Sequence, residues 1–273
     1  MLRSLYSGIS GMRGFQTKLD VIGNNIANVN TIGFKAGRVM FKDILSQSVA
    51  GATSPTAETG GVNAKQIGLG VSVGAIDTVH TPGSAMTTNG PTDLRIDGDG
   101  FFAVTSGTDS ESTYLTRAGN FTLDSNRRLV NSDGMFVLAA EGGGIIQLDE
   151  EVTSFAIGND GSIMSIDADG NATPLDLKIG VVSVPNPGGL EKIGGNLYRG
   201  TQTALGEGVT EITVGSANTN GNGAIISGQL EMSNVDLTSE FTEMIVAQRG
   251  FQANSRIITT SDSILEEIVN LKR

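Results

Sequence analysis

The chain has 273 residues and no cysteine, which excludes disulfide bonds and thiolate metal or redox sites. Its formal net charge of −11 argues against binding to nucleic acid or to an anionic membrane surface. No apolar run reaches the about 18 residues of a membrane-spanning helix, so no membrane insertion is expected.

Residues 2–29 are predicted to form a helix, because apolar side chains recur there at helical spacing. One row consists of Leu5, Met12, Leu19 and Ile26, and an adjoining row consists of Phe15, Ile22 and Val29. Several glycines interrupt the segment, and each costs an isolated helix up to about 1 kcal/mol, so this helix needs a packing partner. The first residues lack the continuous apolar run of a secretory signal, and export by the general secretory route is therefore not expected.

Two segments of small and polar residues flank the middle of the chain. Val49–Ala64 is rich in Gly, Ser and Thr and predicts a flexible or extended linker. The Asn- and Gly-rich tract Ala217–Gly223 predicts the return linker.

Between the linkers, short β-type runs alternate with turn residues, which predicts an antiparallel β domain. The expected strands are Leu94–Val104, Tyr114–Leu123 with Arg128–Val130, Met135–Ala139, Ser154–Ile157, Ile163–Ile166 and Leu177–Val184. Hairpin-type turns are expected at Asp133-Gly134, Asp160-Gly161 and Asp169-Gly170, because glycine adopts positive φ freely.

The C-terminal segment carries an apolar side chain at every seventh position, which predicts a long helix with a coiled-coil-like seam. The seam consists of Leu230, Leu237, Met244, Phe251, Ile258 and Leu265. Ser233 or Asp236 is expected to cap the start of the helix, which should run to the chain end. The row expected to accompany the seam is polar in its middle, so an isolated dimeric zipper is not expected; this companion row is Phe241, Gln248, Ser255, Asp262 and Val269.

Together these patterns predict a mainly β protein with long terminal α-helices and discontinuous domains. The N- and C-terminal helices should pair in a coiled-coil-like way, with a central antiparallel β domain. The expected boundaries are 1–32 and 233–273 for a terminal helical domain, 33–72 and 215–232 for the linker region, and 73–214 for the β domain.

Motifs for catalysis or for cofactor binding are not recognised in the sequence. Asp97 and Asp167 each begin a segment that resembles a calcium loop, but the twelfth position is Thr108 or Lys178 instead of a bidentate carboxylate. His80 has no second histidine for a metal cluster and no nucleophile motif beside it. We therefore expect no enzymatic activity, no metal and no cofactor.

Several segments resemble, in the same order, the signatures of the bacterial flagellar rod and hook protein family. They read LDVIGNNIANVNTIGFK at 19–35, QIGLG at 66–70, DGDGFF at 97–102, YLTRAGNF at 114–121 and GGNLY at 194–198. The end of the chain, which begins SNVDLTSEF at residue 233, resembles the C-terminal helix of the hook protein. The resemblance covers nearly the whole chain.

This resemblance implies a structural subunit that is not an enzyme. In the family, the terminal helices form the inner layer of a tubular polymer and a β domain lies at larger radius. The implied partners are further copies of the chain, the distal rod protein, the hook cap, the hook–filament junction protein and the flagellar type III export apparatus. The implied location is the flagellum, outside the cell after export.

Two members of the family are the main alternatives. GFQANSRIITTSD at 250–262 and VIGNNIAN at 21–28 are similar to the hook protein, a flexible universal joint that carries torque from rod to filament. The length favours the distal rod protein, a stiff shaft, because the chain has no room for the additional outer domain of many hook proteins. We expect a short hook protein of the Gram-positive type, with the distal rod protein as the alternative and a secreted β-rich adhesin or enzyme as a third class.

In such a polymer the functional residues are interface residues, since every subunit repeats the same heterologous contact. We expect them to be Leu5, Met12, Leu19, Ile22 and Ile26 in the first helix, and Leu237, Met244, Phe251, Ile258 and Leu265 in the last. From the family motif, Asn24, Asn25 and Asn28 are expected either to bind backbone groups at the helix end or to be ordinary polar helix-end residues. Gly33 and the linker would let the β domain tilt, and Phe34 belongs to the same motif.

Overall fold

The computed structural model describes residues 2–55, 60–107, 113–140, 143–148, 154–166, 172–206, 212–219 and 221–271. The chain forms two compact units. Unit 1 contains residues 1–27, 37–78 and 236–273, and unit 2 contains residues 28–36 and 79–235.

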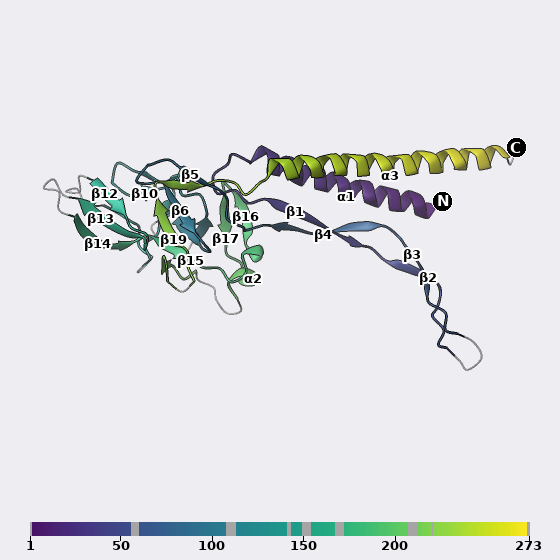
Figure 1. Ribbon diagram of the computed structural model, residues 1–273, viewed down its shortest axis with the longest axis horizontal. Coiled ribbons are helices and arrows are strands. Elements are labelled where there is room, and N and C mark those ends of the chain that lie inside the picture. Colours follow the sequence, from purple (N-terminus) through teal and green to yellow (C-terminus); the bar gives the residue numbers. More distant parts are fainter. Residues whose placement is uncertain are drawn as a thin grey trace. The chain divides into compact units, whose positions relative to one another are not determined.

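Unit 1 contains two long helices that pack against each other in opposite directions (Figure 1). They are α1, Leu2–Ala27, and α3, Leu237–Leu271. Asp236 caps α3, because its Oδ1 accepts a hydrogen bond from the Thr238 backbone N–H at 2.9 Å. The prediction of two paired terminal helices is confirmed. None of the helices in the described ranges is both long and apolar enough to cross a membrane.

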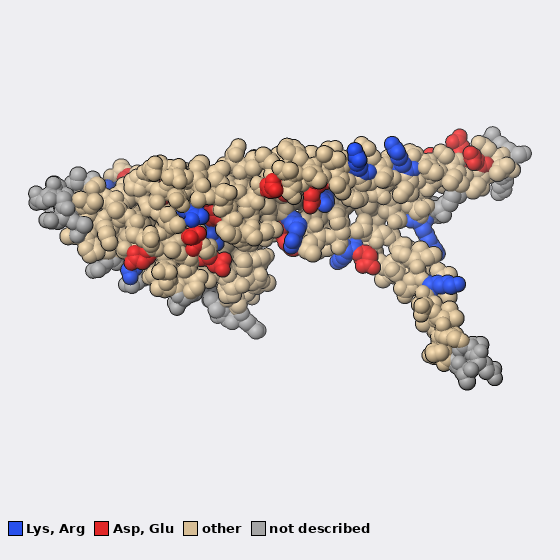
Figure 2. All heavy atoms as spheres, viewed as in Figure 1, with Lys and Arg blue, Asp and Glu red and all other residues tan. Residues whose placement is uncertain are grey.

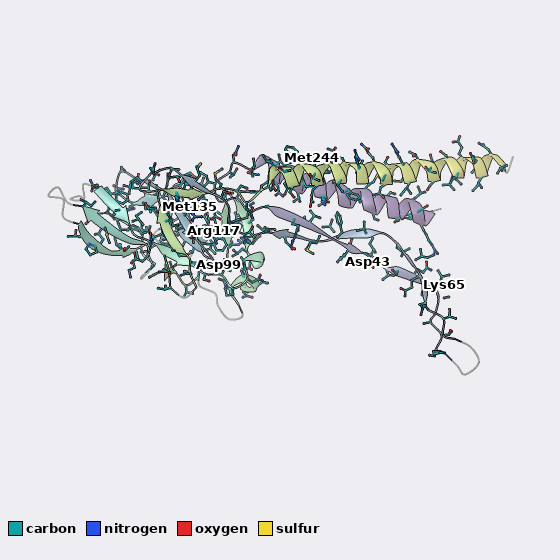
Figure 3. The ribbon with its side chains drawn as sticks, in the orientation of Figure 1. Asp43, Lys65, Asp99, Arg117, Met135 and Met244 are labelled. Carbon is teal, nitrogen blue, oxygen red and sulfur yellow. The ribbon has the colours of Figure 1, made fainter. Side chains whose placement is uncertain are left out.

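The rest of unit 1 is a pair of antiparallel ladders. β1 (Gly37–Asp43) pairs with β4 (Val71–Thr78), and β2 (Ser46–Ala50) pairs with β3 (Lys65–Gly68). Figure 3 labels Asp43 at the end of β1 and Lys65 at the start of β3.

Strands therefore occupy a part of the chain for which the sequence predicted a linker. β2 ends at Ala50, inside the predicted linker Val49–Ala64, and β3 begins directly after that linker at Lys65. An isolated antiparallel bridge joins Thr53 to Val62 within it. Every side chain of β2 and β3 is exposed. Such strands lack the alternation of apolar and polar residues that normally predicts a half-buried strand.

Unit 2 is built from antiparallel strands around an apolar core, as predicted. Its largest sheet has the order β16-β17-β8-β7-β11-β10-β9, and β15 pairs with both β7 and β18. A separate sheet has the order β12-β13-β14, and two further ladders pair β19 with β6 and β20 with β5. Phe102, Leu115 and Val181 are fully buried in the core.

The strands and short helices of unit 2 have the following bounds: β5 Ala85–Thr87, β6 Leu94–Asp97, β7 Phe101–Thr105, β8 Thr113–Thr116, β9 Thr122–Leu123, β10 Leu129–Val130, β11 Phe136–Val137, β12 Ser154–Ile157, β13 Ser162–Ile166, β14 Ala172–Lys178, β15 Gly180–Val182, η2 Pro187–Gly189, β16 Glu191–Gly194, β17 Leu197–Arg199, α2 Gln202–Leu205, β18 Gly215–Ser216, β19 Ala224–Ser227 and β20 Gln229–Glu231.

The predicted continuous strand Leu94–Val104 is divided into β6 and β7. Gly98 and Gly100 have φ values of 112° and 133°, so the chain turns between the two strands. As a result β6 pairs with β19, whereas β7 joins the large sheet.

The turns predicted at Asp133-Gly134 and Asp160-Gly161 are confirmed, with φ values of 78° at Gly134 and 79° at Gly161. The turn predicted at Asp169-Gly170 and the segment that begins at Asp167 lie outside the described residues.

Candidate assembly interface

The two helices of unit 1 meet through small side chains. A methyl group on Gly8 would lie 3.3 Å from Cγ1 of Ile258. A methyl group on Gly250 would lie 2.6 Å from Cζ of Phe15, so glycine at 250 leaves the room that the aromatic ring needs. These contacts fix the antiparallel register of α1 and α3.

Polar contacts between α1 and α3 extend this interface toward the C-terminal end of α1. Lys18 Nζ lies 2.8 Å from Glu243 Oε2, and Asn25 Nδ2 donates to Glu240 Oε1 at 3.0 Å. Burial raises the pKa of Glu240 against the opposing effect of the Asn25 hydrogen bond. The Glu243 side chain is 54% exposed, so its ion pair contributes at most about 1 kcal/mol. The helix pair is held mainly by its close packing.

The companion row predicted for α3 is wrong. The buried residues are Ala247 and Ser261, and each lies three residues after a seam residue. The predicted companion row lies four residues after the seam. Phe241 and Val269 of the predicted row are 49% and 65% exposed. Positions three and four residues from a seam flank it on opposite sides of the helix. The side with the small residues faces α1, because it permits the close approach of the α1 glycines.

The predicted interface residues occupy different environments. In α1, Ile22 is buried and the half-buried residues are Leu5, Met12, Leu19 and Ile26. In α3, Leu237 and Phe251 are 39% and 37% exposed, and the half-buried residues are Met244, Ile258 and Leu265. Their role between subunits remains a proposal.

A different face of α1 packs on the strands of unit 1. The Phe15 and Phe41 rings have centroids 5.9 Å apart. Ser10 Oγ accepts a hydrogen bond from the Val71 backbone N–H at 3.3 Å. α1 is therefore packed between α3 and the β1–β4 ladder.

The asparagines of the family motif differ in their contacts. The Asn25 side chain is buried, accepts a hydrogen bond from the Gly37 N–H at 2.9 Å and donates to the Gly37 carbonyl at 2.8 Å. Asn28 Oδ1 accepts from the Thr31 hydroxyl at 3.1 Å, and Asn24 lies on an exposed face of α1. Asn25 thus binds both backbone groups of the residue that begins β1.

α3 also exposes apolar side chains. Ile257, Ile264 and Ile268 are 46%, 42% and 50% exposed, and their spacing of seven and four residues places them on one side of the helix. Glu267 and Glu266 are exposed in the same part of α3, and Figure 2 shows acidic side chains gathered at that end of the helix. A contiguous exposed apolar row of this kind is typical of a protein contact surface.

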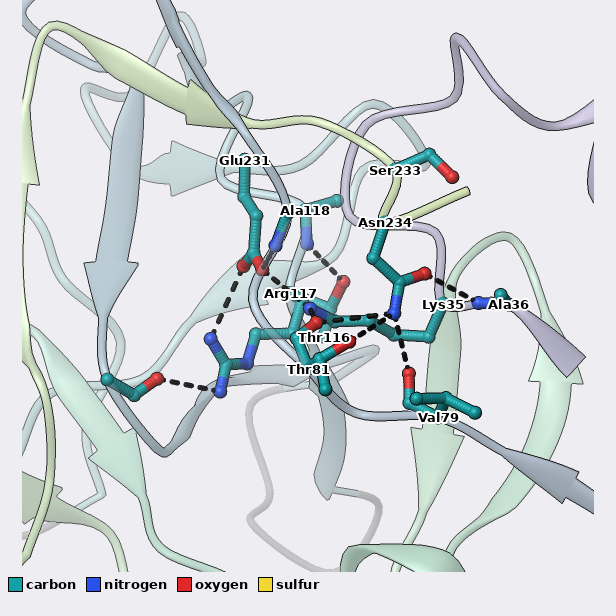
Figure 4. A network of polar contacts seen from close by, with 12 residues as sticks. Lys35, Ala36, Val79, Thr81, Thr116, Arg117, Ala118, Glu231, Ser233 and Asn234 are labelled. Atoms are coloured by element: carbon teal, nitrogen blue, oxygen red, sulfur yellow. Dashed lines mark hydrogen bonds and ion pairs between the residues drawn. The ribbon is translucent and has the colours of Figure 1, made fainter. Parts of the chain in front are cut away.

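In unit 2, three charged residues from distant parts of the chain form a buried cluster, which we call the Glu231 clasp (Figure 4). Lys35 Nζ donates to Glu231 Oε1 at 2.5 Å, and Arg117 Nη1 donates to Glu231 Oε2 at 3.3 Å. The three side chains are 0%, 4% and 1% exposed for Lys35, Arg117 and Glu231. Gly83 N–H also donates to Glu231 Oε1, at 3.0 Å.

The charges of the clasp control its pKa values. Burial alone would raise the pKa of Glu231, but Lys35 and Arg117 outweigh it and hold the pKa below its ordinary value. Burial also lowers the pKa of the neighbouring His80 to about 4, and the positive charges of Lys35 and Arg117 act in the same direction. His80 is therefore neutral at physiological pH.

The segments beside the clasp are tied together by further contacts. Asn234 Oδ1 accepts from the Ala36 N–H at 2.8 Å, and its Nδ2 donates to the Val79 carbonyl at 2.8 Å. Gly33 is buried with a φ of +68°, and a Cβ there would lie 2.6 Å from the Ala118 backbone nitrogen. The neighbouring Phe34 is only 3% exposed. Gly33, which the sequence predicted to let the β domain tilt, is therefore tightly packed.

The sequence interpretation missed the clasp. Lys35 and Arg117 lie inside quoted motifs, and Glu231 stands just before the C-terminal one. No single motif signals the clasp, because its three charged residues meet only in the folded chain. In the described ranges no three His, Asp or Glu side chains are grouped so that they could hold a metal ion. The helix pair and its exposed apolar row can serve for packing and assembly. The charged groups of the clasp hold backbone segments in place.

Three protein-family models match the chain. Residues 5–35 match the flagella basal body rod protein model, residues 95–165 match the flagellar hook protein FlgE/F/G D1 domain, and residues 226–271 match the flagellar basal body rod FlgEFG protein C-terminal model.

Relatives align along the whole chain. The flagellar basal-body rod protein FlgG of Bacillus subtilis is 56% identical over 276 residues, with 100% of both chains covered. The flagellar hook protein FlgE of Borreliella burgdorferi is 30% identical over 449 residues, with 100% of both covered. The hook protein FlgE of Treponema pallidum is 55% identical over 138 residues, which are 50% of this chain and 29% of that one.

The family models and the full-length relatives, together with the paired long terminal helices and the antiparallel β unit, identify an axial structural protein of the bacterial flagellum. The chain belongs to the flagellar rod and hook protein family. Its members are structural components of the flagellar basal body and axis that polymerise with other axial proteins and are not enzymes.

Proposed function

We propose that this chain is a subunit of the distal rod, a stiff tubular shaft that carries torque toward the hook. The observation that carries the proposal is the end-to-end match with the Bacillus subtilis rod protein, at 56% identity over 276 residues. The alignment with the Borreliella burgdorferi hook protein extends over 449 residues, so that protein has long segments without a counterpart here. The rod alternative is therefore better supported than the hook function expected from residues 21–28 and 250–262.

The proposed assembly uses the terminal helices as its inner layer. Residues 1–32 and 233–273 are its polymerisation segments and 73–214 supply its outer β domain. The segments 33–72 and 215–232, which themselves carry β1 to β3 and β18 to β20, stand between them in the sequence. The predicted interface residues from Leu5 to Ile26 and from Leu237 to Leu265 make contacts within the helix pair or between copies. Repetition of one heterologous contact builds an open helical polymer when the rotation between subunits does not close into a ring.

The partners follow from the same proposal. Further copies of the chain and other axial proteins are its neighbours, and the subunit reaches the growing tip through the flagellar type III export apparatus. The hook begins where the rod ends. The hook cap and the hook–filament junction protein belong to the hook function and are not part of this proposal.

Immunogold labelling of hook–basal bodies isolated from the source bacterium tests the function. We expect label along the straight rod, and we expect a strain without this chain to build no hook. Label along the curved hook would overturn the proposal in favour of the hook function.

A further inference from the structure

Unit 1 contains an apolar groove with a volume of about 450 Å³. Tyr6, Ile9, Gly14 and Thr17 line it from α1, and Ile44 and Leu69 line it from the strand side. Tyr6 is 69% exposed and Ile44 is 50% exposed, so the groove is open to a ligand from outside the unit. Arg13 is the charged residue among the described lining residues.

The size and floor of the groove suit a helix. From Tyr6 to Thr17 it follows about 17 Å of α1, at about 1.5 Å per residue. Gly14 forms part of the floor, where the Phe41 ring lies so close that a methyl group would be 2.8 Å from it. A groove with small residues on its floor and apolar walls takes the apolar face of an amphipathic helix.

The exposed row of α3 has the matching dimensions. Ile257, Ile264 and Ile268 also span about 17 Å of helix, and they are exposed in the single chain. Within one chain this row cannot reach the groove, because Tyr6, Ile9 and Thr17 lie on the side of α1 away from α3. The two helices are antiparallel, with Gly8 beside Ile258 and Phe15 beside Gly250. Ile257 therefore lies about 13 Å further along the helix pair than Thr17.

We infer that the groove of one subunit holds the C-terminal part of α3 from a second copy of the chain, with Ile257, Ile264 and Ile268 entering it. The inference rests on the proposed function, since copies in a tube all point in one direction. That polarity makes the incoming α3 antiparallel to the α1 that receives it, with Ile268 near Tyr6 and Ile257 near Thr17.

Charge complementarity supports this direction. Helical side chains lean toward the N-terminus of their own helix. In the antiparallel arrangement Arg13 of one copy and Glu267 of the next lean toward each other, and both side chains are exposed in the single chain. The same two residues therefore select the second copy and its orientation.

Because the natural chain has no cysteine, introduced pairs can be cross-linked without background. Thr17→Cys and Ile257→Cys are placed together in the full chain in the source bacterium, and isolated basal bodies are oxidised. We expect covalent dimers, trimers and longer multimers that contain only this chain. A disulfide needs a Cα separation below about 7 Å, so these two positions cannot link within one chain.

Two matched pairs act as controls. Thr17→Cys with Ile268→Cys tests the opposite direction of α3, and Thr17→Cys with Arg256→Cys tests a position on another side of the same helix. Neither control should give multimers. Multimers from either control in place of the Ile257 pair would overturn the inference. So would cross-linked products that contain a different protein.

A charge exchange provides an independent measurement. Arg13→Glu should reduce the number of rods per cell, and Arg13→Glu with Glu267→Arg should restore it. Rods that contain the chain but show neither multimers nor restoration would overturn this inference alone. Absence of the natural chain from isolated rods would overturn the proposed function and the inference together.

Discussion

Gly33 is fixed by its backbone conformation and by its neighbour. Its φ of +68° favours glycine, and a Cβ would lie 2.6 Å from the Ala118 nitrogen. Gly33→Ala should destabilise unit 2 by about 2 to 5 kcal/mol, which combines about 1 to 2 for the left-handed conformation with about 1 to 3 for overpacking. Urea unfolding measures the loss. Gly134→Ala is the control, because Gly134 has a φ of +78° with no atom within 4 Å, and an equal loss in both variants would contradict the close contact.

Glu231 is the negative partner of two buried cations. Glu231→Gln keeps the shape of the side chain but leaves Lys35 and Arg117 buried without a counter-charge, so the unfolding free energy of unit 2 should fall by about 3 to 5 kcal/mol. Glu191→Gln, which breaks an exposed ion pair with Arg199, should leave the unfolding free energy nearly unchanged. Thermal unfolding of both variants checks this, and comparable losses would show that the clasp adds no stability.

His80 makes the stability of unit 2 depend on pH. Its ring lies 5.7 Å from Phe101 and 5.6 Å from Tyr198 between ring centroids, and its pKa is lowered from 6.5 to about 4. The unfolded chain therefore binds the proton first on acidification. Stability that is fully present above about pH 6.5 is lost progressively as the pH falls toward about 4, and the slope ends there.

The melting temperature measured between about pH 5 and 6.5 isolates this effect, since Glu231 titrates below its ordinary pKa of 4.5. His80→Phe keeps an aromatic ring and should flatten the slope. A natural chain with a flat profile in this range, or a variant with an unchanged slope, would show that His80 is not the group that titrates.

Among the elements, the α1–α3 pair should be destabilised by a charge placed where the two helices touch. Ile258→Asp places a carboxylate against Gly8 of α1, and burying it without a partner should cost several kcal/mol. We expect export of the subunit but no rod, and an unchanged melting temperature for unit 2. Thr259→Asp, on an exposed side of α3 away from both Gly8 and the row of Ile257, Ile264 and Ile268, is the control and should assemble normally. Normal rods from the Ile258 variant would show that this position is not buried on assembly.

An element could be predicted from the sequence where the residues that determine it lie close together in the chain. The seven-residue repeat from Leu237 to Leu265 lies within one segment, so α3 could be predicted, and Asp236 was among the expected caps. The β19–β6 ladder joins Ile225 to Ile96, and a strand whose partner is so distant has no local signature. The predicted seam on α1 did not include Gly8 and Gly11, because contact rows built from glycine carry no apolar signal. The clasp depends on the meeting of three distant residues, which the sequence does not encode in any one motif.

At the scale of the whole molecule, the two units should differ in local stability. Unit 2 has an extensive buried core, whereas the side chains of β2 and β3 in unit 1 are all exposed. Local opening costs least where few apolar side chains are buried. In the isolated chain, amides of α1, α3 and β1 to β4 should therefore exchange hydrogen faster than those of β7 and β8, and assembly should slow them. Hydrogen exchange with mass spectrometry measures this, and equally slow exchange of α3 and β7 in the isolated chain would contradict it.

The hydrogen bond from the Val79 N–H to the Ala36 carbonyl, at 2.8 Å, pins together the two ends of Gly37–Thr78. In terms of chain entropy this segment is a closed loop, and doubling the length of such a loop costs only about 0.6 kcal/mol. Insertions between β2 and β3 therefore leave the ends in place and the register of unit 2 unchanged. The length of the β2–β3 hairpin is thus free to change while the fold of unit 2 stays the same.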